Sequence, residues 1–283
     1  MCRLALKNGY RHFDTADMYG NEEEVGQAIR ESGIPRSEIF LTTKLNNDAH
    51  DSVSEAFQAS LQSLNCGYID LYLMHWPQAD GPRGVLREGQ RPTFIDTWKD
   101  MEKLLDTGKV KSIGVSNFSI KTLSALLPHC TTIPAINQVE LNPCLPQEEL
   151  KAFCEEQGIV LTAYCPLGQS NRIFLKDADI VKIAESHTVT PAQVALSWGV
   201  QRGTIVIPKS ENEGRMKQNI TLIALSPAEM DQINAIHRKP NMHRSLCGYH
   251  SKGNGPKGGW GIFGWSYEEL GWNMGEDGVV LDA

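Results

Sequence analysis

Seven short apolar runs, each ending in a polar residue, recur along the chain and alternate with helical patterns. The first lies within residues 10–19, and the others cover residues 40–44, 69–75, 112–117, 135–138, 159–164 and 204–209. This alternation continues to about residue 236 and favours parallel βα units. Because the carboxyl ends of parallel strands meet at one face of a barrel, the polar endings predict a single active-site mouth.

The length of the chain suits one such barrel. A chain of 283 residues that is 41% hydrophobic can bury a large core, and a (β/α)8 barrel takes roughly 250 residues. We therefore predict a single domain over residues 1–283, in which residues 237–283 form a carboxyl-terminal tail. The tail has no periodicity but is rich in glycine and aromatic residues. Two interpretations stay open, a loosely packed end and an aromatic flap over the pocket.

The amino end lacks one element of a complete barrel. Only residues 1–8 precede the first run, which is too few for a full helix, and no strand comes before them. Counting from there gives seven strands, one short of closure. The predicted fold class is thus α/β, a (β/α)8 TIM barrel with its first strand missing.

Charge and cysteine content argue against several classes of protein. A formal net charge of -7 disfavours a nucleic-acid or anionic-membrane surface, where Lys and Arg must neutralise phosphates. No apolar run approaches about 18 residues, the length that a membrane-spanning helix needs. The apolar stretch at the start of the chain is too short for a signal peptide, so we expect a cytoplasmic protein. Seven cysteines without CxxC spacing predict free thiols and no metal site.

Capping patterns mark the starts of several helices. Asn-x-x-Glu over residues 21–24 predicts a reciprocal cap on the first full helix. Residues 190–193 and 226–229 each combine a capping box with proline at the first helical position. Residues 77–94, rich in Gly and Pro, predict a long loop on the active-site side.

Four polar side chains at or just past the ends of three successive runs form a candidate catalytic set, Asp14, Tyr19, Lys44 and His75. A phenol has an ordinary pKa near 10 and is a poor acid or base at pH 7. A nearby Lys44 ammonium would lower the pKa of Tyr19, and Asp14 would keep that lysine charged. His75 could then orient a carbonyl. Each residue alone has a structural explanation, but buried charges are costly unless paired, so the combination favours a site.

The sequences around these residues resemble those of the aldo-keto reductases. The matching stretches are GYRHFDTA at 9–16, IFLTTKL at 39–45, IDLYLMHWP at 69–77, GVSNF at 114–118 and IPKS at 207–210. The resemblance covers roughly residues 4–236. It implies a barrel that transfers hydride between NADPH and an aldehyde or ketone without a metal. By this resemblance Tyr19 is the general acid/base, Asp14 and Lys44 tune it, and His75 positions the carbonyl.

The resemblance also implies a site for NADP(H). The residues that match contacts to the nicotinamide carboxamide are Ser116, Asn117 and Gln138, and Tyr164 matches the aromatic that stacks on the ring. The loop that matches the pyrophosphate cover contains Pro166, Leu167, Gly168 and Gln169. Strand or loop capping remains the other explanation of Asn117 and Gln138.

The adenine end of the cofactor is matched by Lys209, Ser210, Arg215, Gln218 and Asn219. An arginine fork with a lysine suits a ribose 2′-phosphate, so the cofactor is expected to be NADP(H) rather than NAD(H). Gln218 stands where family members often have a carboxylate. Trp76 and the tail aromatics are expected to line the substrate pocket.

We therefore predict an NADP(H)-dependent aldo-keto reductase of the fungal glycerol dehydrogenase and aldehyde reductase type. It would act as a monomer on small carbonyl, sugar or polyol-related substrates, without nucleic-acid or membrane partners. A cofactor-binding regulatory protein and a truncated, catalytically impaired product are the alternatives. The complete catalytic set favours the enzyme.

Overall fold

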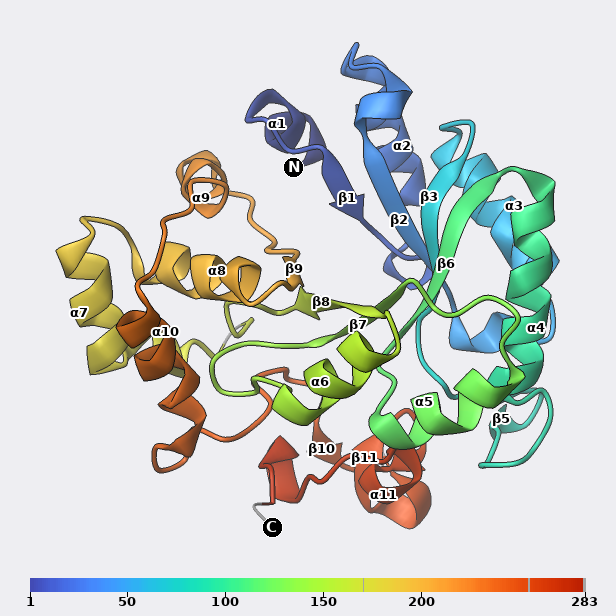
Figure 1. Ribbon diagram of the computed structural model, residues 1–283. Helices are drawn as coiled ribbons and strands as arrows, with labels where there is room; N and C mark the ends of the chain where they lie inside the picture. The colour runs from blue at the N-terminus through green and yellow to red at the C-terminus, as the bar shows by residue number, and fades with distance from the viewer. Residues whose placement is uncertain (170, 254, 282–283) are drawn as a thin grey trace. The chain divides into compact units, whose positions relative to one another are not determined.

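The seven expected strands are all present in the computed structural model, which describes residues 1–169, 171–253 and 255–281 (Figure 1). They are β1 (His12–Asp14), β2 (Phe40–Leu45), β3 (Ile69–Met74), β6 (Val110–Ser116), β7 (Ile136–Glu140), β8 (Val160–Tyr164) and β9 (Ile205–Val206). They form one sheet in the order β1-β2-β3-β6-β7-β8-β9, with parallel pairing where the register is defined. The described residues thus contribute seven strands to this sheet, one fewer than a closed (β/α)8 barrel has.

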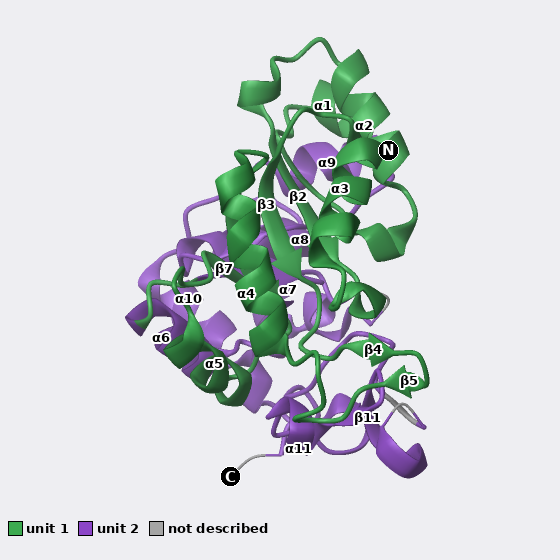
Figure 2. Cartoon of the chain, turned by 90° about the vertical axis from the view of Figure 1, so that its right-hand side faces the viewer, with its two compact units in different colours: residues 1–137, 157–159 green, residues 138–156, 160–283 purple. Residues whose placement is uncertain are grey.

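The chain divides into two compact units (Figure 2). Unit 1 comprises residues 1–137 and 157–159, and unit 2 comprises residues 138–156 and 160–283. The boundary falls inside β7, so β1, β2, β3 and β6 belong to unit 1 and β8 and β9 belong to unit 2. That the chain acts as a single domain stays a prediction.

Unit 1 contains one short helix before β1 and four longer helices that alternate with its later strands. They are α1 (Cys2–Lys7), α2 (Glu22–Glu31), α3 (Val53–Leu64), α4 (Phe94–Leu104) and α5 (Ile120–Leu126). In α3 the buried residues Val53, Phe57 and Leu64 recur at helical spacing, which is why this segment packs as an amphipathic helix. Before β1 there is only the short helix α1. The 77–94 loop holds a small hairpin, β4 (Asp80–Gly81) and β5 (Gly84–Val85), before Thr93 caps α4.

The predicted cap on the first full helix is wrong. The Asn21 side chain makes no capping hydrogen bond to α2. Its Oδ1 instead accepts a hydrogen bond of 2.7 Å from the hydroxyl of Thr15. The side chain is therefore used to hold the loop before the helix, which a local capping pattern does not reveal.

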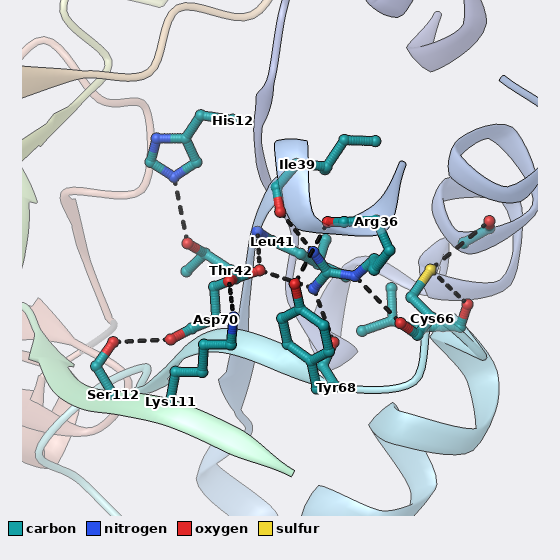
Figure 3. A network of polar contacts seen from close by, with 12 residues as sticks. His12, Arg36, Ile39, Leu41, Thr42, Cys66, Tyr68, Asp70, Lys111 and Ser112 are labelled. Carbon is teal, nitrogen blue, oxygen red and sulfur yellow. Dashed lines mark hydrogen bonds and ion pairs between the residues drawn. The ribbon is translucent and has the colours of Figure 1, made fainter. Parts of the chain in front are cut away.

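A polar network lies at the amino ends of the unit 1 strands (Figure 3). Arg36 donates to the carboxylate of Asp70 at 2.7 Å and to the carbonyl oxygen of Tyr68 at 2.8 Å. The same carboxylate accepts a hydrogen bond of 3.0 Å from the backbone N–H of Leu41. Arg36 and Lys111 each lie over the Tyr68 ring, 4.0 Å from its centroid. This amino-end network ties the start of β2 to the start of β3.

Unit 2 holds the remaining helices, α6 (Glu148–Glu156), α7 (Ala178–Ser186), α8 (Pro191–Gln201), α9 (Glu213–Asn219), α10 (Pro227–Asn234) and α11 (Tyr267–Leu270). The predicted capping boxes at the starts of α8 and α10 are confirmed, with Thr190 and Ser226 as the capping residues. Both helices carry proline in the first turn, where its missing N–H costs nothing.

The tail contains regular structure. A small antiparallel sheet consists of β10 (Ser251–Lys252), β11 (Trp260–Ile262) and β12 (Trp265–Ser266), and α11 follows directly. Ile262, Trp265 and Leu270 are buried. A loosely packed end does not fit these buried residues, and the flap over a pocket stays a prediction.

Candidate active site

A buried ion pair joins the carboxyl ends of β1 and β2. The ammonium of Lys44 contacts the carboxylate of Asp14 and donates to the carbonyl oxygen of Thr15 at 2.8 Å. The side chains of Lys44 and Asp14 are 0% and 10% exposed. Each charge depends on the other, because removing one partner of a buried pair leaves an uncompensated charge.

Tyr19 lies directly beside this pair. The Lys44 Nζ is 5.2 Å from the centroid of the Tyr19 ring. The rings of Tyr19 and His75 meet edge to face, with centroids 5.7 Å apart. Tyr19 is 51% exposed although Lys44 is completely buried. The structure therefore brings the four residues of the candidate catalytic set together, with the phenol as the member most open to solvent.

His75, which follows β3, is a buried imidazole. Burial, and secondarily the positive charge of Lys44, lowers its pKa to about 3. Its Nδ1 is buried without a hydrogen-bond partner among the described residues. The ring is therefore neutral near pH 7, and a neutral imidazole can donate a hydrogen bond from one nitrogen.

The loop that carries Tyr19 is fixed at both flanks. On one side the Thr15 hydroxyl donates to Asn21, and on the other the Thr43 hydroxyl donates to the carboxylate of Glu22. Burial raises the pKa of Glu22, an effect that the Thr43 hydrogen bond opposes. Thr15 and Thr43 directly follow and precede the ion-pair residues in sequence. The sequence did not predict these two hydrogen bonds. The one indication of them is that Thr15 and Thr43 are next to Asp14 and Lys44 in the sequence.

Two of the predicted nicotinamide residues lie at the carboxyl end of β6, where Ser116 is the last residue of the strand and Asn117 follows it. Ser116 and Asn117 are both buried, and Asn117 has a left-handed backbone with φ of 64°. The Asn117 amide donates to the carbonyl oxygen of His75 at 2.9 Å and to the hydroxyl of Ser116 at 3.1 Å. Asn117 thus links the ends of β3 and β6. Trp76 is also buried, next to His75 in sequence.

The other predicted nicotinamide residues lie in unit 2. Gln138 is buried in β7, and Tyr164 ends β8 with its hydroxyl hydrogen-bonded to the hydroxyl of Tyr249. In the loop that follows, Pro166 and Gly168 are buried and Leu167 is partly buried.

Position 168 accommodates only glycine. Its φ is 74°, and a Cβ there would lie 2.4 Å from the carbonyl oxygen of Asn171. A larger residue would be strained and would clash with backbone. Glycine therefore lets the loop pack tightly against Asn171 and Leu246 at this point.

The predicted phosphate- and adenosine-binding residues lie just before α9 and along it. Lys209 is exposed, with Glu211 3.5 Å from its Nζ, and Asn212 caps the helix by accepting from the Arg215 N–H at 2.9 Å. Ser210 accepts a hydrogen bond of 3.2 Å from the backbone N–H of Asn212. Arg215 and Gln218 are exposed, and Asn219 is buried. Two accessible cations on one short stretch fit an anionic phosphate.

The described residues hold neither a cluster of metal-ligating side chains nor a membrane-spanning helix. Within residues 1–169, 171–253 and 255–281, no three His, Cys, Asp or Glu side chains gather as they would around a metal ion. None of the helices in the same ranges is long and apolar enough to cross a membrane. All seven cysteines are free thiols.

Comparison with known proteins assigns the chain to a family. The aldo/keto reductase family model matches residues 1–238, and the chain belongs to this family. It is 45% identical to glycerol 2-dehydrogenase (NADP(+)) of Saccharomyces cerevisiae, over 85% of this chain and 83% of that protein. It is 44% identical to aldehyde reductase YPR1 of the same yeast, over 83% and 81% of the two chains.

Solved structures agree with this assignment. The crystal structure of a Bombyx mori aldo-keto reductase in complex with NADP is 38% identical, with a TM-score of 0.75, and the match covers 82% of this chain and 80% of that chain. An aldo/keto reductase from Brucella melitensis is 42% identical, with a TM-score of 0.74 and coverage of 82% and 87%. The predicted family, fold class and oxidoreductase class are confirmed.

Proposed function

We propose that this protein is an NADP(H)-dependent oxidoreductase that reduces aldehydes or ketones to alcohols. Small carbonyls, sugars and polyol-related compounds are the proposed substrates, in keeping with the names of its yeast relatives. The observation that carries the proposal is the buried Lys44–Asp14 pair beside the exposed Tyr19. That arrangement provides a proton donor next to a fixed positive charge.

Each member of the cluster has one role. NADPH, when bound, supplies the hydride to the carbonyl carbon. Tyr19 donates the proton to the carbonyl oxygen, and the Lys44 ammonium stabilises the negative charge left on the phenol oxygen. Asp14 holds Lys44 in place. The neutral His75 donates a hydrogen bond that orients the carbonyl oxygen.

The proposed cofactor contacts follow the resemblance residue by residue. Ser116, Asn117 and Gln138 would bind the carboxamide, and Tyr164 would stack on the nicotinamide ring. The loop with Pro166, Leu167 and Gly168 would cover the pyrophosphate. At the far end, Lys209 and Arg215 would bind the 2′-phosphate, with Ser210, Gln218 and Asn219 around the adenosine. Trp76 would contribute to the substrate pocket.

The protein would work as a monomer in the cytoplasm. All four members of the catalytic set come from one unit of one chain, so the chemistry needs no second subunit. Seven free thiols suit a reducing compartment.

NADPH binding and turnover on the same sample test the proposal. Tryptophan fluorescence would report NADPH binding, and absorbance at 340 nm would then report cofactor oxidation after glyceraldehyde is added. We expect the wild type to bind and turn over. Tyr19→Phe should bind NADPH within about twofold but lose turnover, because the phenol proton is needed only during transfer. Unchanged turnover in this variant would refute the catalytic assignment, and wild-type binding without turnover would favour a cofactor-binding regulatory protein.

Cofactor choice gives a second test. Lys209→Ala or Arg215→Ala should weaken NADPH binding about 10- to 150-fold and NADH binding much less, because each loses a charge-assisted contact to the 2′-phosphate. Lys217→Ala is the matched control, because Lys217 lies on α9 with Arg215 and pairs with Glu213 at 3.0 Å. It should leave the binding of both cofactors nearly unchanged. Equal losses for the two cofactors would place the 2′-phosphate elsewhere.

A further inference from the structure

A segment beyond the family-matched residues packs on the carboxyl end of β7. We call residues 244–250 the clasp segment. The buried carboxylate of Glu140, at the end of β7, accepts hydrogen bonds from the hydroxyl of Ser245 and from the backbone N–H of Leu246, the latter at 2.7 Å. Burial raises the pKa of Glu140, and these two hydrogen bonds oppose the rise. Glu140 therefore fastens the clasp segment two residues from Gln138.

The clasp segment also reaches β8 and the loop that follows it. The hydroxyl of Tyr249 is hydrogen-bonded to the hydroxyl of Tyr164. The N–H of Gly248 donates to the side-chain oxygen of Gln169 at 3.1 Å. The side chain of Leu246 closes over Gly168, where an added Cβ would lie 2.9 Å from it. Tyr249 thus contacts the end of β8, and Leu246 and Gly248 contact the loop that follows it.

The other side of the clasp segment is anchored to the rest of the tail. The backbone N–H of Ser245 donates to the carbonyl oxygen of Gly278 at 2.8 Å. The Nδ1 of His250 lies 3.0 Å from the hydroxyl of Tyr267. Since both ends of the segment are held, it can act as a fixed support.

We propose that the clasp segment is a positioning element for the nicotinamide half of the cofactor. Tyr249 fixes the Tyr164 side chain through its hydroxyl, and Gly248 fixes Gln169. Tyr164 stays partly accessible, so a ring can still stack on it. A platform that is already held loses less freedom on binding, which strengthens affinity. This inference rests on the proposed function and gives the tail a role in cofactor binding.

Removal of one hydroxyl tests the inference. Tyr249→Phe deletes the hydroxyl that contacts Tyr164. We expect NADPH binding about three- to tenfold weaker, with faster dissociation in stopped-flow fluorescence. Binding of 2′,5′-ADP, which lacks the nicotinamide, should stay within about twofold. Tyr68→Phe is the matched control, because it also loses one phenol hydroxyl but lies in the amino-end network, and it should leave both ligands unchanged.

A second variant separates the possible outcomes. Ser245→Ala, which loosens the clasp at Glu140, should weaken NADPH in the same direction without affecting 2′,5′-ADP. The inference is overturned if Tyr249→Phe leaves NADPH binding unchanged, or if it weakens both ligands equally. If the wild type does not bind NADPH at all, both the proposed function and this inference are refuted. If the wild type binds NADPH and Tyr249→Phe binds it equally well, only the positioning role of the clasp segment is refuted.

Discussion

Two ion pairs lie at opposite ends of the unit 1 strands, and their surroundings differ. At the amino ends, Arg36 pairs with Asp70 and also donates to the backbone carbonyl oxygens of Tyr68 and Cys66. At the carboxyl ends, Lys44 pairs with its carboxylate beside an exposed phenol. In the first pair, Arg36 also donates hydrogen bonds to backbone carbonyl oxygens. In the second pair, the Lys44 ammonium lies next to the exposed phenol of Tyr19. A buried pair alone therefore indicates structure, and an accessible titratable neighbour indicates chemistry.

The largest contrast should appear in turnover. Lys44→Met removes the charge beside Tyr19, so kcat for glyceraldehyde should fall about 10²- to 10⁴-fold. The control is Lys111→Met, which removes a mostly exposed lysine of the amino-end network and should keep kcat within about twofold. Rates are compared per folded molecule, with the folded fraction taken from circular dichroism. Similar losses in the two variants would abolish the distinction between the pairs.

The next contrast concerns stability. Asp70→Asn breaks the amino-end pair and leaves Arg36 without its counter-charge, so the free energy of unfolding in urea should fall by about 3–5 kcal/mol. Turnover per folded molecule should hardly change. Asp100→Asn, in an exposed pair with Lys103, should cost less than about 1 kcal/mol. A loss of turnover in Asp70→Asn as deep as that in Lys44→Met would show that both ends serve catalysis.

A smaller effect is expected from the hydrogen bonds that anchor the loop carrying Tyr19. Thr43→Val keeps the shape of the side chain but removes the hydrogen bond to Glu22, so Tyr19 should be held less precisely. We expect kcat about tenfold lower with little change in KM for NADPH. Thr43→Ser retains the hydroxyl and should restore most of the rate. A serine variant as slow as the valine variant would point to a packing effect instead.

The last difference concerns pH, and near neutral pH it should be small. Because His75 has its pKa lowered to about 3, kcat should show no ionisation near pH 6.5. Unfolded His75 takes up a proton below about pH 6.5 while the folded form does not. The stability that this histidine contributes is therefore complete above pH 6.5 and is lost as the pH falls toward 3, by at most about 1.4 kcal/mol per pH unit. His75→Asn should have a shallower stability slope over this range, and an equal slope would contradict the neutral imidazole.

Sequence reasoning found the strands and the catalytic cluster because both follow from local patterns. Apolar runs locate β2 and β3, and the parallel arrangement brings Lys44 and His75 to one end. The anchor of Asn21 was misassigned because a capping pattern cannot show that Thr15 competes for the same oxygen. The amino-end network and the clasp were missed because their partners are far apart in sequence. Glu140 and Ser245, for example, are 105 positions apart.

The most direct test of the account follows the hydrogen that is transferred. NADPH with deuterium at both C4 positions would be mixed with glyceraldehyde, and the glycerol formed would be analysed by mass spectrometry. Wild type and Asp70→Asn should give glycerol with one deuterium on the former carbonyl carbon, whereas Tyr19→Phe and Lys44→Met should give almost none in the same time. If Tyr19→Phe forms deuterated glycerol at the wild-type rate, the candidate catalytic set is not the site of the reaction.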